Sequence, residues 1–154
     1  MLQPKIYVKS KRKVFDKKKV FDAKEIHFDI DVVAIDDGIN IDYCELDFDE
    51  VEFMDNTGFK DKHGANIYAG SIVEYIRKHH DVGTLRGVIC KDEYGAYVIE
   101  LYVIKDHWDN KLDKMLGSKV EHEKPNLSFL LDSTTHDGCI VLGNIYEDKE
   151  LLKC

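Results

Sequence analysis

The amino-acid sequence predicts a mainly β protein built from antiparallel hairpins, with one short helix inserted between strands. Short runs in which apolar and polar residues alternate recur along the chain, as they do in half-buried strands. Proline occurs only 2 times in 154 residues, and the 10 glycines stand mostly where one run gives way to the next. About eight to ten short strands joined by tight turns fit either a barrel or two packed sheets.

The N-terminal third contains a predicted hairpin. Lys5–Val8 has the pattern of a first strand, and Ile26–Ile35 alternates over its whole length. Asp37-Gly38 supplies residues that tolerate the positive φ of a tight hairpin turn, and Ile39–Phe48 alternates again as the return strand. Acidic side chains then gather on the solvent face, because unpaired carboxylates are costly to bury. The inward-facing set of the first strand is Ile26, Phe28, Ile30 and Val32.

The middle of the chain shows more short strands. Val51–Met54 is one, and Ile72–Ile76 is another. Between them, Asp61–Gly64 resembles a type I turn closed by a glycine in the left-handed region. Leu85–Lys91 and Ala96–Ile104 then have the pattern of a further hairpin. Sequential hairpins of this kind favour antiparallel pairing.

Residues 105–126 depart from the two-residue period. Their apolar residues have the i, i+4, i+7, i+8 spacing of one helix face. Asp106 is suited to cap the start of such a helix and Gly117 to end it, which predicts about three helical turns followed by a polar loop. A last strand is expected at Cys139–Tyr146. The apolar stripe consists of Trp108, Leu112, Met115 and Leu116.

Charge is distributed unevenly. Residues 1–19 hold eight basic groups and one acid, whereas the stretch from Asp22 to Asp55 holds thirteen acids and one base. Three interpretations are open: the basic arm neutralises the acidic body, the arm contacts nucleic acid, or the acidic stretch Asp29–Asp55 imitates a phosphate backbone and occupies a DNA-binding protein. The candidate nucleic-acid contacts are Lys11, Arg12, Lys13, Lys17, Lys18 and Lys19.

Composition also indicates the compartment. No apolar run approaches the roughly 18–20 residues that span a bilayer, and the start of the chain leads into a basic stretch without an apolar signal core. The cysteines stand far apart in sequence, so we expect reduced thiols, mostly small buried hydrophobes, in a cytoplasmic protein without membrane contact. They are Cys44, Cys90, Cys139 and Cys154.

No motif specifies catalysis. The sequence lacks GxSxG, GxxxxGK[ST], GxGxxG and HExxH patterns, and its seven histidines are scattered, mostly over predicted turns and loops. Adjacent His79 and His80 would point to opposite faces of a strand, which disfavours a shared metal. We therefore expect no catalytic, cofactor-binding or metal-binding residues and no enzymatic activity.

Four segments resemble the YopX family of phage and prophage proteins. The longest is Phe53–Val73, which is similar to the family's "TGLKDKNGKEIYEGDIV" signature; the family's Glu-Gly-Asp is Ala69-Gly70-Ser71 here. Val141–Glu147 matches its closing "GNIYE" strand. Val14–Lys18 resembles its "AWDKK" motif, and Leu46–Val51 resembles its "DFDDI" motif. The resemblance implies an SH3-like barrel, closed or partly open, in a bacterial host. It implies no established activity, so no catalytic residue can be carried over.

The resemblance also suggests a division of the chain. Residues 1–55 are expected to form an N-terminal β segment with the basic arm and the acidic hairpin, and residues 56–154 a YopX-like barrel with an insertion at 105–126. Four glycines are predicted to serve as structural turns: Gly38, Gly58, Gly64 and Gly70. The leading functional hypothesis is a non-enzymatic phage accessory or interaction module with an unidentified protein partner; nucleic-acid binding is the alternative, and a homo-oligomer stays open.

Overall fold

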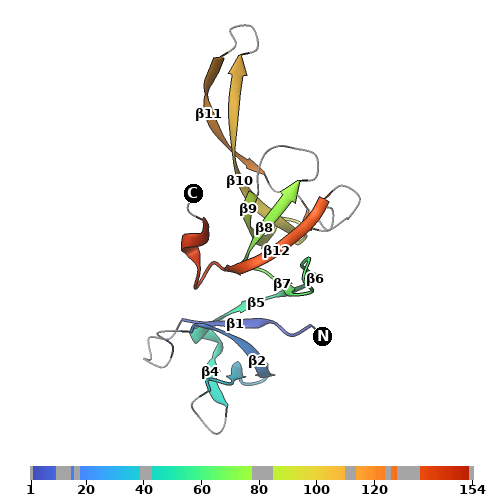
Figure 1. Cartoon of the computed structure of the whole chain (residues 1–154). Coiled ribbons are helices and arrows are strands. Elements are labelled where there is room, and N and C mark those ends of the chain that lie inside the picture. Colours follow the sequence, from blue (N-terminus) through green and yellow to red (C-terminus); the bar gives the residue numbers. More distant parts are fainter. Residues whose placement is uncertain are drawn as a thin grey trace.

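In the computed structural model, the described residues form two five-stranded antiparallel sheets and one small two-stranded sheet (Figure 1). It describes residues 2–9, 15, 18–38, 43–77, 85–109, 114–123, 126–127 and 136–152. The described elements are strands and short 3-10 helices, which confirms a mainly β fold with antiparallel sheets. Within these residues no helix is both long and apolar enough to span a membrane.

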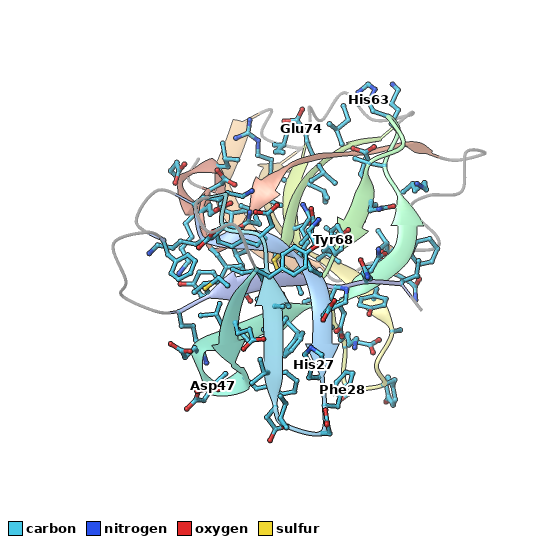
Figure 2. The ribbon with its side chains drawn as sticks, turned by 90° about the horizontal axis from the view of Figure 1, so that it is seen from below. His27, Phe28, Asp47, His63, Tyr68 and Glu74 are labelled. Carbon is cyan, nitrogen blue, oxygen red and sulfur yellow. The ribbon has the colours of Figure 1, made fainter. Side chains whose placement is uncertain are left out.

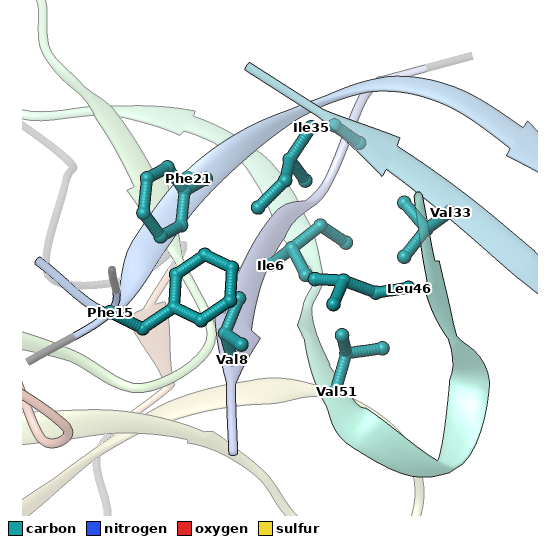
Figure 3. Packing of buried hydrophobic residues seen from close by; sticks show 9 residues of the cluster. Ile6, Val8, Phe15, Phe21, Val33, Ile35, Leu46 and Val51 are labelled. Carbon is teal, nitrogen blue, oxygen red and sulfur yellow. The ribbon is translucent and has the colours of Figure 1, made fainter. Parts of the chain in front are cut away.

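The first sheet has the strand order β4-β3-β2-β1-β5. Its strands are β1 (Lys5–Val8), β2 (Val20–His27), β3 (Val32–Ile35), β4 (Cys44–Asp47) and β5 (Val51–Met54), with the 3-10 helix η2 (Phe48–Glu50) between the last two. Its core forms because the strands bury alternate aliphatic side chains against Phe15 and Phe21, whose rings meet edge to face 5.7 Å apart (Figure 3). Phe15, which precedes β2 in the chain, is only 1% exposed and belongs to this core.

The second sheet has the strand order β11-β10-β9-β8-β12. Its strands are β8 (Ser71–Arg77), β9 (Leu85–Lys91), β10 (Tyr97–Asp109), β11 (Lys114–Glu123) and β12 (His136–Asn144); β6 (Asn56–Lys60) and β7 (Asn66–Tyr68) form the small sheet, and η3 (Lys149–Leu152) follows β12. A separate cluster of buried side chains holds this half together: Ile67, Val73, Ile89, Ile99, Leu127 and Cys139. The described residues therefore form two hydrophobic cores, one for each large sheet.

Of the arrangements that the sequence left open, which were a closed barrel, a partly open barrel and two packed sheets, the described strands do not form the closed barrel. Each large sheet ends in two strands with a single neighbour, β4 and β5 in the first and β11 and β12 in the second. The small β6–β7 sheet does not join these edges, because its two strands pair only with each other. The described strands thus form open sheets.

The helix expected within residues 105–126 is also wrong. This region belongs to a long hairpin in which β10 pairs with β11, with a bulge between His107 and Trp108 (Figure 1). Trp108 and Met115, seven residues apart in sequence, are paired with each other between β10 and β11. Two apolar residues that pair across the strands near the end of a hairpin can therefore have the i, i+7 spacing of a helix. Of the polar loop expected at Lys119–Asn126, the part up to Glu123 is strand as well.

The predicted strand Ile26–Ile35 is in fact two strands. Residues 28–31 form a turn between β2 and β3, where Asp31 has a φ of 54°. Phe28 and Ile30, expected inside, are 67% and 64% exposed as a result. Gly38 does have positive φ, but residues 39–42 of the expected return strand lie outside the described part of the chain.

Candidate functional site

The closing segment from Gly143 to Asp148 joins the two large sheets. Asn144 organises it: its Oδ1 accepts the backbone N–H groups of Tyr146 and Glu147, at 3.0 Å each. This asparagine turn directs Glu147 toward the first sheet, where its Oε1 accepts the backbone N–H groups of Lys19 at 2.7 Å and Val20 at 3.0 Å. The segment therefore clasps the start of β2.

Two tyrosines reinforce this clasp. The ring of Tyr146 stacks on that of Tyr7 in β1, with centroids 4.0 Å apart. Two effects raise the pKa of Tyr146 to about 12: burial, which is the larger, and a hydrogen bond to the Glu52 side chain. Since Glu52 belongs to β5, the closing segment contacts three strands of the first sheet: β1, β2 and β5.

The signature segment contains a turn with three carboxylate hydrogen bonds. Asp61 is 8% exposed, and its Oδ1 accepts the N–H groups of His63 and Ala65 at 2.8 Å each. Its Oδ2 accepts the N–H of Val141 in β12 at 3.0 Å. Burial raises the pKa of Asp61, but these hydrogen bonds outweigh it and leave the pKa below its ordinary value. The signature aspartate thus fixes the β6–β7 hairpin to β12, which is a structural role.

The turn between β9 and β10 repeats this geometry. Asp92 Oδ1 accepts the N–H groups of Tyr94 and Ala96 at 2.9 Å each, as Asp61 does for the equivalent residues of its own turn. Both turns read Asp-x-x-Gly-Ala, and Gly64 and Gly95 have φ of 84° and 82°. The sequence reasoning missed this short internal repeat, although the spacing was visible.

An apolar groove lies where the two large sheets meet. Its volume is about 470 Å³. Ile26 and Phe53 reach it from the first core, and Tyr97 reaches it from the second. The full lining is Leu2, Pro4, Ile26, Phe28, Phe53, Asp55, Asn56 and Tyr97. Two polar groups among them are engaged: Asp55 pairs with Lys91 Nζ at 2.6 Å, and Asn56 Oδ1 accepts the Gly58 N–H at 2.9 Å.

Two phenylalanines of the groove lining, Phe28 and Phe53, contact a third phenylalanine, Phe48, outside it. The ring of Phe48 meets Phe53 on one side at 5.1 Å and Phe28 on the other at 5.9 Å, both edge to face. We call Phe28, Phe48 and Phe53 the aromatic ladder. Figure 2 shows Phe28, His27 and Asp47 at one end of the molecule, with His63 and Glu74 at the opposite end. None of the three ladder residues was singled out as a site by sequence reasoning, because their juxtaposition depends on the β2–β3 turn.

Four exposed carboxylates lie in the two segments that carry Phe28 and Phe48. Asp29 and Asp31 lie in the β2–β3 turn, and Asp47 and Asp49 precede and follow Phe48; all four are exposed. We call them the acidic rim. Within the described ranges no three His, Cys, Asp or Glu side chains converge in a way that could hold a metal ion.

The candidate nucleic-acid contacts fall mostly outside the described residues. Lys11, Arg12, Lys13 and Lys17 are among those not described. Lys18 Nζ lies 5.0 Å from the centroid of the Phe21 ring, and the backbone N–H of Lys19 binds Glu147. The described end of the arm is therefore held against the protein.

The predicted turn glycines differ in their settings. Gly38, Gly58, Gly64 and Gly70 all have positive φ, between 73° and 87°. Gly58 lies within β6 rather than between strands, and a Cβ there would meet Leu2 of the groove at 3.3 Å.

Among the cysteines, Cys139 is buried and Cys44 and Cys90 are partly buried thiols, whereas Cys154 lies outside the described residues.

These features define a mainly β protein of two open antiparallel sheets, clasped by its closing segment and carrying an apolar groove where the sheets meet. A family model described as YopX protein matches residues 2–153. The chain therefore belongs to the YopX family. No curated protein and no solved structure matches it.

Proposed function

We propose that this YopX family protein is a non-enzymatic interaction module that binds an apolar segment of a partner protein in the groove between its two large sheets. The observation that carries the proposal is the exposure of large apolar side chains that line the groove. Phe28 is 67% exposed and Leu2 is 60% exposed, although both line the same concave surface. Exposed apolar side chains gathered in a groove mark interaction sites in soluble proteins.

The lining favours a protein segment over a small polar ligand. A small-molecule site needs a few convergent polar groups to orient its ligand. Here Asp55 is already paired with Lys91, and the side-chain oxygen of Asn56 is bound to Gly58. Most of the remaining lining is apolar, which suits one or two large side chains of a partner anchored among aromatic rings.

Selection from a random peptide library tests the proposal. Twelve-residue peptides displayed on phage are selected on the immobilised wild-type protein, and the affinities of the enriched peptides are then measured for two variants. Phe28→Ser removes the exposed aromatic wall, and we expect affinity to fall by about tenfold or more. Tyr94→Ser is the matched control, since Tyr94 is 86% exposed on the β9–β10 turn and does not line the groove.

The outcomes distinguish docking in the groove from binding elsewhere or no binding. Enriched peptides that lose affinity for Phe28→Ser and keep it for Tyr94→Ser support docking in the groove. Peptides that bind both variants as well as the wild type, or a selection that enriches none, overturn the proposal. Circular dichroism of both variants checks that the fold is intact, and Phe28→Leu adds a milder change should the serine variant unfold.

A further inference from the structure

We infer that the partner segment is basic as well as apolar: its apolar anchor enters the groove and its lysine or arginine side chains lie over the acidic rim. This inference rests on the proposed function and names the chemistry of the partner. It is carried by the arrangement of the aromatic ladder and the rim on one end of the first sheet.

The rim residues are close neighbours of the ladder residues in sequence, and one backbone hydrogen bond joins the two segments that carry them. Asp29 directly follows Phe28, and Asp47 and Asp49 flank Phe48. The Phe48 backbone N–H donates to the Asp31 carbonyl at 2.8 Å, which brings the β2–β3 turn against η2. An anchor on Phe28 or Phe48 therefore leaves the neighbouring residues of the partner beside these carboxylates.

The groove is electrostatically asymmetric. At its inner end, Asp55 is neutralised by Lys91, whose Nζ also lies 5.3 Å from the Tyr97 ring centroid. Beside the aromatic ladder, the described residues place no lysine or arginine in an ion pair with the rim residues Asp29, Asp31 or Asp49. Like charges gathered at one end of a sheet raise the free energy of the folded protein, and a cationic partner relieves that repulsion.

Of the described lysines among residues 1–19, Lys9 comes near the rim, because its backbone N–H donates to the carbonyl of Glu50 at 2.8 Å, whereas Lys18 and Lys19 do not reach it. Lys18 and Lys19 precede β2, and the turn that carries Asp29 follows it. A strand rises about 3.3 Å per residue, so eight-residue β2 separates the two ends by about 23 Å. That distance exceeds the Debye length of about 8 Å at physiological salt, so these two lysines do not neutralise the rim.

The peptides selected through the groove provide the probe. We expect them to combine aromatic or aliphatic residues with lysine or arginine, and to bind more weakly as sodium chloride rises from about 50 to about 300 mM. In the rim variant Asp29→Asn/Asp31→Asn/Asp49→Asn their affinity should fall by about tenfold, since each exposed ion pair contributes modestly. Asparagine also tolerates the left-handed backbone of Asp31.

A charge-matched control removes three exposed acids elsewhere: Asp22→Asn/Glu93→Gln/Glu150→Gln. Affinity that falls for the rim variant and stays within about twofold for this control supports a basic partner. Peptides that depend on Phe28 but are neutral or acidic, and bind the rim variant normally, overturn this inference and leave groove docking in place. Peptides without any dependence on Phe28 overturn the proposed function itself.

Discussion

The ring of Tyr7 stacks on the ring of Tyr146, with centroids 4.0 Å apart and planes inclined by 16°. The two residues are far apart in sequence and belong to different halves of the structure. Tyr7 comes from β1, and Tyr146 follows β12. Together with the bonds from Glu147 to the start of β2, this stack couples the two large sheets through the closing segment.

The tyrosine clasp should contribute to stability in two separable parts. Tyr146→Phe keeps the stack but removes the hydrogen bond to Glu52, so we expect the free energy of unfolding to fall by about 1 kcal/mol. Tyr146→Ala also removes the stack and should cost about 2–3 kcal/mol. Urea unfolding followed by circular dichroism at pH 7 measures both values. Equal stabilities for the two variants would show that the stack contributes nothing.

Alkaline pH provides an independent check on Tyr146. Its pKa is raised from 10.0 to about 12, so the folded state holds this proton more tightly than the unfolded state. The associated stability is complete below pH 10 and is lost as pH rises toward 12. Wild-type stability should therefore decline more steeply over this window than that of Tyr146→Phe. Parallel declines would contradict the contact.

Acid pH should weaken the Glu147 bonds to β2. Burial raises the pKa of Glu147, but the hydrogen bonds from Lys19, Asn144 and Val20 outweigh burial and leave the pKa below its ordinary value of 4.5. A depressed folded-state pKa means that the stability is present above pH 4.5 and is lost as pH falls through the folded pKa. Glu147→Gln should flatten the acid side of the stability profile, whereas Glu150→Gln, an exposed change in η3, should not.

Sequence reasoning succeeded where pairing is local. The β9–β10 hairpin was predicted from alternation on both sides of Glu93-Tyr94-Gly95, and the turn at Asp61–Gly64 from its closing glycine. In both, the residues that determine the structure lie within a few positions of each other. The same reasoning failed at Trp108, because a cross-strand pair and a helical face can share one spacing.

The candidate site could not be predicted from the sequence. The groove takes Leu2, Phe53 and Tyr97 from distant parts of the chain, and no periodicity relates such positions. The Glu147 carboxylate bonds residues 128 and 127 positions away. The exposure of Phe28 depends on where β2 ends, and element boundaries are the least certain part of any sequence-based prediction. Only the acidic character of the rim was visible from composition.

The two Asp-x-x-Gly turns offer a matched pair of substitutions. In Asp61→Asn, the amide oxygen can still accept from His63 and Ala65, but the amide nitrogen then faces the N–H of Val141, donor against donor. We expect the free energy of unfolding to fall by about 2 kcal/mol, because a bond to a charged group is lost and a buried donor is left unpaired.

Asp92→Asn is the control for that change. The bonds of Asp92 Oδ1 to Tyr94 and Ala96 match those of Asp61, whereas the bond to Val141 belongs to Asp61 alone. Its substitution should therefore cost less than about 0.5 kcal/mol in the same chemical denaturation assay. Equal losses at the two aspartates would mean that the bond across to β12 adds no stability.

Gly143 should be intolerant of even a methyl group, for reasons of space rather than backbone strain. A Cβ at this position would overlap Asp148 Oδ2 and lie 2.9 Å from the Asp148 Cβ. That same oxygen accepts the Asn144 N–H at 3.0 Å, so Gly143→Ala should displace it and loosen the clasp, at a cost of about 1–3 kcal/mol. Because Asp148→Ala removes the clashing carboxylate, the double variant should lose less than the sum of the two single changes. Strict additivity in thermal and urea unfolding would show that Gly143 and Asp148 do not compete for this space.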